Sequence, residues 1–174
     1  MYAPAEEIVQ IVDRDNLVTG ALPRHQMRSR GLIHRASYIL VFNQRQELFV
    51  QKRTTIKDIY PGYWDVAAGG VVLAAESYEQ SASRELTEEL GISGTPLTPL
   101  FDHYFEDATN RVWGRVFRCT HEGPFTLQPE EVESGRFMSV PQILESCLRE
   151  PFTPDGILIL QKMEQDHSGR FIMS

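Results

Sequence analysis

Three glutamates, Glu85, Glu88 and Glu89, are spaced so that they could share one metal ion. In a helix, a rotation of about 100° per residue places their carboxylates within one arc of roughly 100°. Like charges held this close repel one another, and a hard divalent cation such as Mg²⁺ or Mn²⁺ accepts several carboxylate oxygens at once. A solvated acidic helix face would give the same short pattern. The wider spacing around the glutamates decides between the two interpretations.

A longer pattern surrounds this cluster. Five residues separate Gly70 from Glu76, seven more separate Glu76 from Arg84, and Gly91-Ile92 closes the pattern. Arg84 can pair with Glu76 or a neighbouring carboxylate and fix its conformation, as groups around metal ligands do. Gly70 lets the chain bend before the helix, and its backbone carbonyl is a further candidate metal ligand. Gly91 is well placed to end the helix.

The whole pattern, residues 70–92, resembles the Nudix box at every position that the box specifies. The resemblance implies a Nudix fold of the α+β class, in which a mixed β-sheet is sandwiched between helices. It also implies a MutT-like pyrophosphohydrolase that uses Mg²⁺ or Mn²⁺. The substrate would be a small molecule, a nucleoside diphosphate linked to another moiety or a related organic diphosphate. In the family, box glutamates hold the metal and one glutamate acts as base, which makes Glu85, Glu88 and Glu89, with Arg84, the expected catalytic residues.

A wider resemblance, from His34 to Leu144, is to isopentenyl-diphosphate isomerase and the Nudix hydrolases close to it in sequence. It rests on His34-Arg35-Ala36, Gln51-Lys52-Arg53, Pro61-Gly62-Tyr63-Trp64 and Glu76-Ser77.

The positions that carry the isomerase chemistry differ in this chain. A catalytic cysteine and a metal-binding histidine flank the first glycine of the box in the isomerase, and Gly69 and Val71 stand there instead. Another metal histidine is replaced by Met27, and two glutamates of a later strand by Asn110 and Val112. We therefore keep the scaffold and reject the isomerase activity.

Five residues outside the box are candidates for the site. Arg53 and Lys57 match the basic pair that grips the diphosphate in the isomerase, with solvated surface charges as the alternative. Trp113 lies on a later predicted strand and could bind the substrate by stacking, with core packing as the alternative. Glu130 and Glu131 lie in an acidic loop where some Nudix enzymes place an additional base or metal ligand.

The residue pattern also predicts the elements that must position these groups. Apolar residues at every fourth position predict an amphipathic helix over Glu76–Leu90. Strands are predicted at Glu7–Val12, Leu17–Leu22, Ala36–Phe42, Glu47–Gln51, Tyr63–Val72, Leu100–Glu106, Val112–Cys119 and Gly135–Ser139, and further helices near Pro141–Cys147 and Pro154–Gln165. Residues 1–30 are expected to form an N-terminal β-hairpin and a short helix, and the next two strands a second pair.

Composition limits the setting of the protein. The 174 residues suit a single Nudix domain over 1–174, and a net charge of −7 argues against binding to nucleic acid or an anionic membrane. Met1–Gln10 lacks the features of a signal peptide, and Cys119 and Cys147 lie far apart, so we expect a cytoplasmic protein with free thiols. The sequence leaves the oligomeric state open, a homodimer included.

Two further classes compete with the hydrolase. A catalytically silent Nudix-fold binding module would usually lose box carboxylates, whereas Arg84, Glu85, Glu88 and Glu89 are all present. An acidic structural domain without a site would leave the box unexplained. The identity of the substrate cannot be derived, because specificity lies in loops outside the box.

Overall fold

The computed structural model describes residues 4–170. Its strands are β1 (Ile8–Val12), β2 (Val18–Pro23), β3 (His34–Phe42), β4 (Leu48–Arg53), β5 (Trp64–Asp65), β6 (Ala68–Val71), β7 (Thr98–Glu106), β8 (Arg111–Thr120) and β9 (Val132–Met138). Its helices are the 3₁₀ turn η1 (Pro4–Glu6), α1 (Arg24–Ser29), α2 (Tyr78–Leu90), α3 (Val140–Ser146) and α4 (Pro154–Arg170). Within this range no helix is long and apolar enough to cross a membrane. Residues 1–3 of the Met1–Gln10 segment lie outside the described residues.

The mixed sheet is built around β3. This strand pairs antiparallel with β6 and parallel with β8, the latter from His34↔Val112 to Phe42↔Thr120. β8 continues antiparallel to β7, and β4 pairs antiparallel with β5 and β9. The apolar run 39–42 of β3 is buried on both faces, which is typical of a strand covered by helices on each side.

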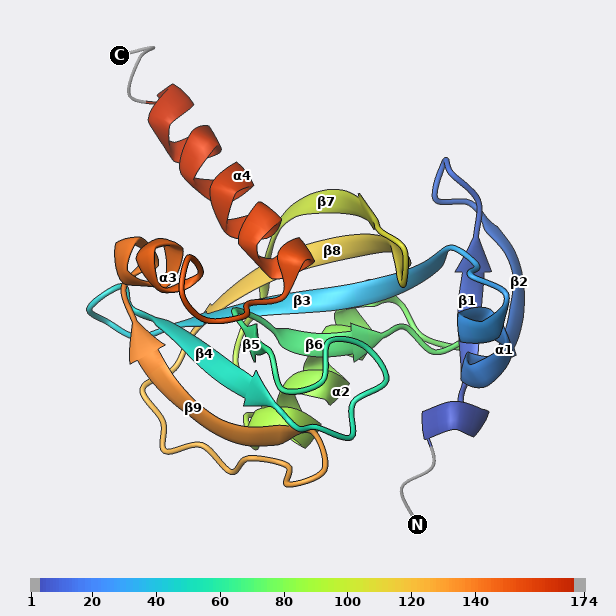
Figure 1. The fold of residues 1–174 in the computed structure, drawn as a ribbon, viewed down its shortest axis with the longest axis horizontal. Helices are drawn as coiled ribbons and strands as arrows, with labels where there is room; N and C mark the ends of the chain where they lie inside the picture. Colours follow the sequence, from blue (N-terminus) through green and yellow to red (C-terminus); the bar gives the residue numbers. More distant parts are fainter. Residues whose placement is uncertain (1–3, 171–174) are drawn as a thin grey trace.

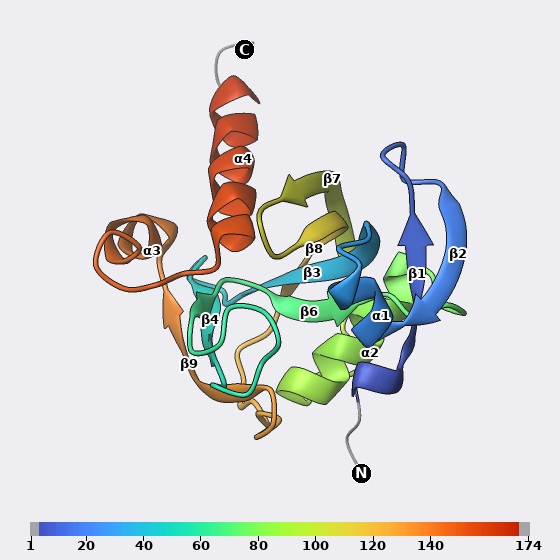
Figure 2. The same ribbon diagram turned by 45° about the vertical axis from the view of Figure 1, so that its right-hand side comes forward.

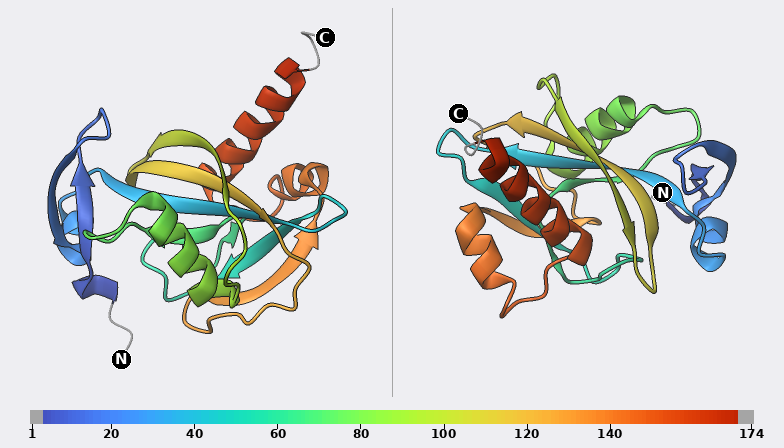
Figure 3. Two further views of the ribbon diagram at one scale, coloured as in Figure 1. Left: turned by 180° about the vertical axis from the view of Figure 1, so that it is seen from behind. Right: turned by 90° about the horizontal axis from the view of Figure 1, so that it is seen from above.

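Two apolar cores cover the opposite faces of this sheet. Ile39 and Val41 of β3 pack in the core beneath α2, whereas Leu40 and Phe42 pack in the core shared with α3 and α4. This alternation follows from the two-residue period of a strand. Figure 1 and the two views of Figure 3 show α2 on one side of the sheet and α3 and α4 on the other. The predicted α+β sandwich is therefore confirmed.

The predicted N-terminal hairpin is also confirmed. β1 and β2 pair from Ile8↔Pro23 onward, and the pair Ile11↔His34 joins the hairpin to β3. The short helix α1 follows directly, and its Met27 is buried against the hairpin and β6. Figure 2 shows α1 between the hairpin and the rest of the sheet.

One prediction about strands is confirmed only next to its turn, and another was wrong. β3 and β4 share only the pair Phe42↔Leu48 next to their turn, because β4 runs alongside β9 instead. The continuous strand predicted over Tyr63–Val72 is divided into β5 and β6. The carboxylate of Asp65 accepts the amide of Ala67 at 3.2 Å, and this local hydrogen bond turns the chain between the two strands.

Candidate active site

The helix that carries the glutamates begins and ends at capping residues. Ser77 Oγ accepts the amide of Gln80 at 3.1 Å, and Gln80 Oε1 accepts the amide of Ser77 at 2.8 Å, which forms a capping box. Gly91 has a φ of 69°, the left-handed conformation that closes a helix. Leu86 and Leu90 are buried against the sheet, and the carboxylates of Glu85 and Glu89 lie next to β6.

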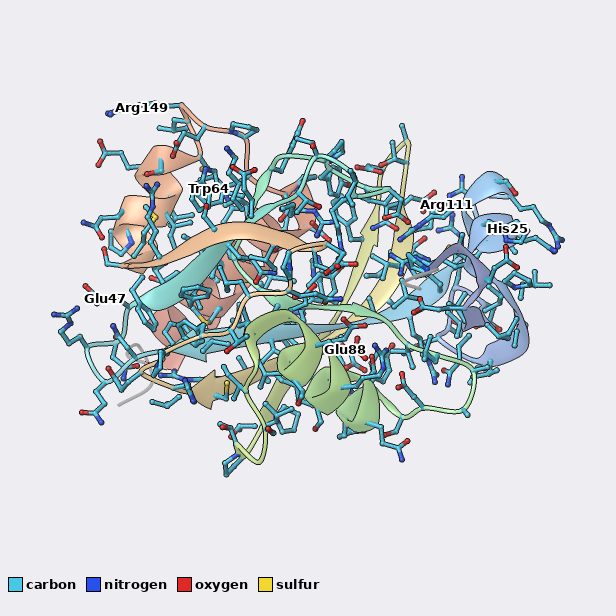
Figure 4. All side chains as sticks on the ribbon, turned by 90° about the horizontal axis from the view of Figure 1, so that it is seen from below. His25, Glu47, Trp64, Glu88, Arg111 and Arg149 are labelled. Atoms are coloured by element: carbon cyan, nitrogen blue, oxygen red, sulfur yellow. The ribbon has the colours of Figure 1, made fainter. Side chains whose placement is uncertain are left out.

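Arg84 organises the carboxylates around it. Its Nε and Nη2 donate to the two carboxylate oxygens of Glu76 at 2.6 and 3.0 Å. Its Nη1 donates to Glu85 at 2.8 Å and to Glu88 at 3.1 Å. Glu88, labelled in Figure 4, is the more exposed of the two glutamates. One guanidinium thus fixes three carboxylates in single conformations.

Glu89 is buried, and the half-buried Glu85 lies one helical turn before it. Glu89 accepts hydrogen bonds from Gln51 Nε2 at 3.0 Å and from the amide of Gly69 at 3.1 Å. Burial raises the pKa of Glu89, although the positive charge of Lys57 opposes the shift. Burial, followed by the charge of Glu89, raises the pKa of Glu85 to about 7. Two carboxylates that repel each other at a buried position favour the binding of a cation between them.

Two glycines of β6 bring the strand against these groups. A Cβ on Gly70 would lie 2.5 Å from Glu85 Oε1, so only glycine leaves room for that carboxylate. Gly69 has a φ of 143°, and a Cβ there would lie 2.0 Å from the backbone oxygen of Ser37. Position 69 therefore accepts no side chain at all.

A cavity opens beside β6, and we call it the β6 cavity. Its lining includes Arg24, Arg28, Ser37, Tyr38, Arg53, Lys57, Asp58, Gly69, Gly70, Asn110, Val112 and Asp155. Both basic residues expected to bind substrate, Arg53 and Lys57, lie in its wall. The chain thus brings them to the same side of the molecule as Gly70 and the buried glutamates.

Arg53 and Lys57 have different environments. Arg53 donates twice to the carbonyl of Ile59, at 3.2 and 2.8 Å, and once to Asp65 at 3.2 Å, so it holds the 54–62 loop in place. Lys57 forms an ion pair with Glu131. Burial lowers the pKa of Lys57, although the charge of Glu89 opposes the shift. Lys57 is therefore the cation that links the β6 cavity to the glutamates.

The acidic loop contributes one of its two candidates. Glu131 is buried against Lys57, and burial raises its pKa to about 7. Glu130 is exposed, and its carbonyl accepts the hydroxyl of Thr54 at 2.8 Å. The loop is tied to the end of α2, because the amide of Gln128 donates to the carbonyl of Glu89 at 3.0 Å.

Trp113 lies away from this site. Its indole nitrogen donates to the carbonyl of Arg14 at 3.1 Å, and its ring packs near Tyr104 at a centroid distance of 5.3 Å. The neighbouring Val112 lines the β6 cavity. Successive side chains of a strand point to opposite faces, so Trp113 is directed away from the cavity. Its position gives no support to the expected role in substrate binding.

The sequence did not single out several polar residues that the fold brings to this site. Gln51 could have been found by the two-residue period, because it precedes Arg53 by two positions on β4. Tyr38 donates to Asp155 at 2.7 Å across 117 positions of the sequence, which no local pattern indicates. Arg24 and Arg28 enter the cavity wall only because α1 packs against β6.

The residues fit a divalent cation by their chemistry, although they do not form a finished cage. Among residues 4–170, no three His, Cys, Asp or Glu side chains converge in the geometry of metal ligands. Glu85 and Glu88 instead share Arg84 as their cation. The donor set is nevertheless made of carboxylates and a nearby backbone carbonyl, at Gly70, which are the ligands that hard cations select.

Comparison with known proteins agrees with this geometry. The family model of the NUDIX domain matches residues 32–162. The Uncharacterized Nudix hydrolase PA4841 of Pseudomonas aeruginosa is 44% identical over 155 residues, covering 89% of this chain and 92% of the relative. The Uncharacterized Nudix hydrolase YfcD of Escherichia coli is 44% identical over 154 residues, covering 88% and 84%. The crystal structure of DR0079 from Deinococcus radiodurans has the same fold, with a TM-score of 0.79 at 22% identity, covering 90% of this chain and 98% of that one. The chain therefore belongs to the Nudix family and is a hydrolase that acts on diphosphate linkages.

Proposed function

We propose that this hydrolase requires Mg²⁺ or Mn²⁺ and cuts the diphosphate linkage of a nucleoside diphosphate joined to another moiety, or of a related organic diphosphate. The observation that carries the proposal is the pair formed by half-buried Glu85 and buried Glu89 beside Gly70, with Lys57 close by. A diphosphate needs positive charge around it, and a chain of net charge −7 must supply that charge locally.

The side chains divide the work between metal and substrate. Glu85, Glu88, Glu89 and the carbonyl of Gly70 would hold the cation, which when bound neutralises phosphate oxygens and makes water a stronger nucleophile. Arg84 keeps Glu85 in one conformation. Gln51 and the amide of Gly69 do the same for Glu89 by hydrogen bonding.

Lys57 and Glu131 would act on the substrate side of the site. The Lys57 ammonium would bind a phosphate oxygen, and its ion pair keeps Glu131 beside it. Glu131 is placed to accept a proton there. Arg53 would support this arrangement through the 54–62 loop as well as bind phosphate.

Isomerase activity has no support from the geometry of β6. A cysteine at position 69 would clash with the backbone of Ser37. Val71 is packed with Val9, Ile11 and Met27, and its side chain offers no ligand atom. The carbonyl oxygen of the Asn110 side chain, at another position that holds a glutamate in the isomerase, accepts a hydrogen bond from Arg28 at 2.9 Å.

The test is a panel of nucleotide sugars, dinucleotides, nucleoside triphosphates and isoprenoid diphosphates with Mg²⁺ or Mn²⁺, followed by identification of the products. We expect cleavage at a diphosphate linkage that stops when a chelator is added. Glu89→Gln should abolish it, whereas Glu79→Gln, an exposed residue of the same helix, should not. Cleavage that survives the chelator or Glu89→Gln would refute the proposed site.

A further inference from the structure

Helix α1 supplies two arginines to the wall of the β6 cavity. Arg24 and Arg28 lie one helical turn apart on the same side of α1, and their side chains are 15% and 19% exposed. Buried Met27 fixes α1 against the hairpin and β6. Both arginines precede residue 32, where the match to the family model begins. This part of the cavity is thus contributed by a segment outside the matched domain.

The two guanidinium groups share few acceptors. Arg28 donates to Asp58 at 3.1 Å and to the neutral amide of Asn110 at 2.9 Å. Arg24 donates to the half-exposed Glu7 at 3.3 Å. The buried Nε of Arg24 lies 3.4 Å from Asp58, yet it makes no hydrogen bond to any described residue. Both arginines are thus ion-paired, Arg24 with Glu7 and Asp58 and Arg28 with Asp58, but the buried Nε of Arg24 is left without a hydrogen-bond acceptor.

A buried donor without an acceptor is unfavourable unless a further group completes it, and beside two arginines an anion would do so. Although burial raises the pKa of Asp58, the charges of Arg24 and Arg28 lower it to about 2, so Asp58 stays ionised. Guanidinium forks match the oxygens of a phosphate group.

We propose that Arg24 and Arg28 form a second anion-binding subsite, which takes a phosphate monoester of the substrate separate from the diphosphate that is cut. The inference rests on the proposed function, which assigns the diphosphate to Lys57 and the glutamates. Lys57 and Asp58 are neighbours in the chain, so the subsite lies directly beyond Lys57 in the same cavity. In Figure 4, His25 of α1 and Arg111 at the start of β8 mark this end of the molecule.

The first test is independent of activity and uses inorganic phosphate as the probe. Phosphate is titrated into the metal-free protein while the Nε–H signals of the arginines are followed by NMR. We expect saturable shifts of Arg24 and Arg28, and binding that is roughly 10- to 100-fold weaker in Arg28→Ala. Arg30→Ala, an exposed arginine beside the same helix, is the matched control and should bind like the parent. Absence of these shifts, or equal binding by Arg28→Ala, would overturn the subsite.

Asp58→Asn separates anion binding from a merely structural role. If the arginines only hold α1 against the 54–62 loop, Asp58→Asn and Arg28→Ala should weaken phosphate binding to a similar extent. If they bind an anion, Asp58→Asn removes a competing carboxylate and should bind phosphate at least as tightly as the parent. Weaker binding in Asp58→Asn would contradict the proposal. Arg28→Lys keeps the charge and controls for folding.

The second test compares substrates that differ by one phosphate monoester, such as NADH with NADPH or dephospho-CoA with CoA. We expect the parent to favour the phosphorylated member in kcat/KM, and Arg28→Ala to lose this preference while Arg30→Ala keeps it. A panel in which no diphosphate is cut would refute the proposed function, while the phosphate titration still decides the subsite. Cleavage without a preference would refute the role of the subsite in substrate choice.

Discussion

Replacing Gly70 with alanine should disable the enzyme while leaving the fold nearly unchanged. The new Cβ would lie 2.5 Å from Glu85 Oε1, whereas ordinary contact begins at 3.4 Å, so the carboxylate must retreat by about 0.9 Å. Gly70 lies outside the left-handed region, so alanine adds no backbone strain. The atoms that must move are the end of a flexible side chain. A misplacement near 1 Å in a working group costs roughly 100-fold in rate.

The measurement is kcat/KM for the best substrate of the panel, together with the free energy of unfolding in urea. We expect Gly70→Ala to lose roughly 100-fold in kcat/KM and to change the free energy of unfolding by less than about 1 kcal/mol. Two other glycines provide controls. Gly20→Ala meets no atom within 4 Å and should change neither quantity, whereas Gly69→Ala collides with the backbone of Ser37 and should prevent folding.

The cause can be checked in a double variant. If Gly70→Ala acts by displacing Glu85, it should add little loss to Glu85→Gln, so the two effects should be strongly non-additive. Full additivity would show that the added methyl group acts elsewhere. Retention of kcat/KM within about twofold in Gly70→Ala would refute the assignment of Glu85 to the site.

Three further predictions follow from the site. Glu89→Gln and Glu88→Gln should each lower metal-dependent turnover by orders of magnitude at unchanged fold, and turnover equal to the parent in both would refute the metal site. Arg53→Ala should lower kcat/KM by an amount that corresponds to a loss of about 2–5 kcal/mol in transition-state stabilisation. The metal affinity, measured by calorimetry, should change little. A loss of metal affinity as large as the loss of kcat/KM would contradict this. Burial lowers the pKa of His34 to about 3, so the unfolded chain binds a proton first as the pH falls below about 6.5. The parent should therefore lose stability relative to His34→Gln as the pH falls from 6 to 4. The difference between their free energies of unfolding should fall by up to about 1.4 kcal/mol per pH unit, and a constant difference would refute this.

The sequence predicted best what depends on neighbouring residues. The period of α2, its cap at Gly91 and the pairing of Arg84 with Glu76 involve positions that are close in the chain, so local rules suffice. The sheet covered by helices on both faces followed from the resemblance to the Nudix box rather than from the pattern of any one strand.

Features that depend on strand register could not be predicted in the same way. The divergence of β3 and β4 depends on β9, which begins far along the chain at Val132. The direction of Trp113 depends on which face of β8 covers the cavity, and a shift of one residue reverses it. The two arginines of α1 became part of the site only through the docking of Met27. These features depend on contacts between residues that are far apart in the sequence, and local propensity does not determine such contacts.

The 121–131 segment contains no helix, yet it is joined firmly to the end of α2. The amides of Thr126 and Gln128 donate to the carbonyls of Leu90 and Glu89, each at 3.0 Å, where the helix has no amide donors of its own for these carbonyls. These two amides should therefore exchange with solvent deuterium only when the last turn of α2 opens. Loop and helix then form one cooperative unit of local unfolding, in which Glu131 and Glu89 keep their relative positions until both are lost together.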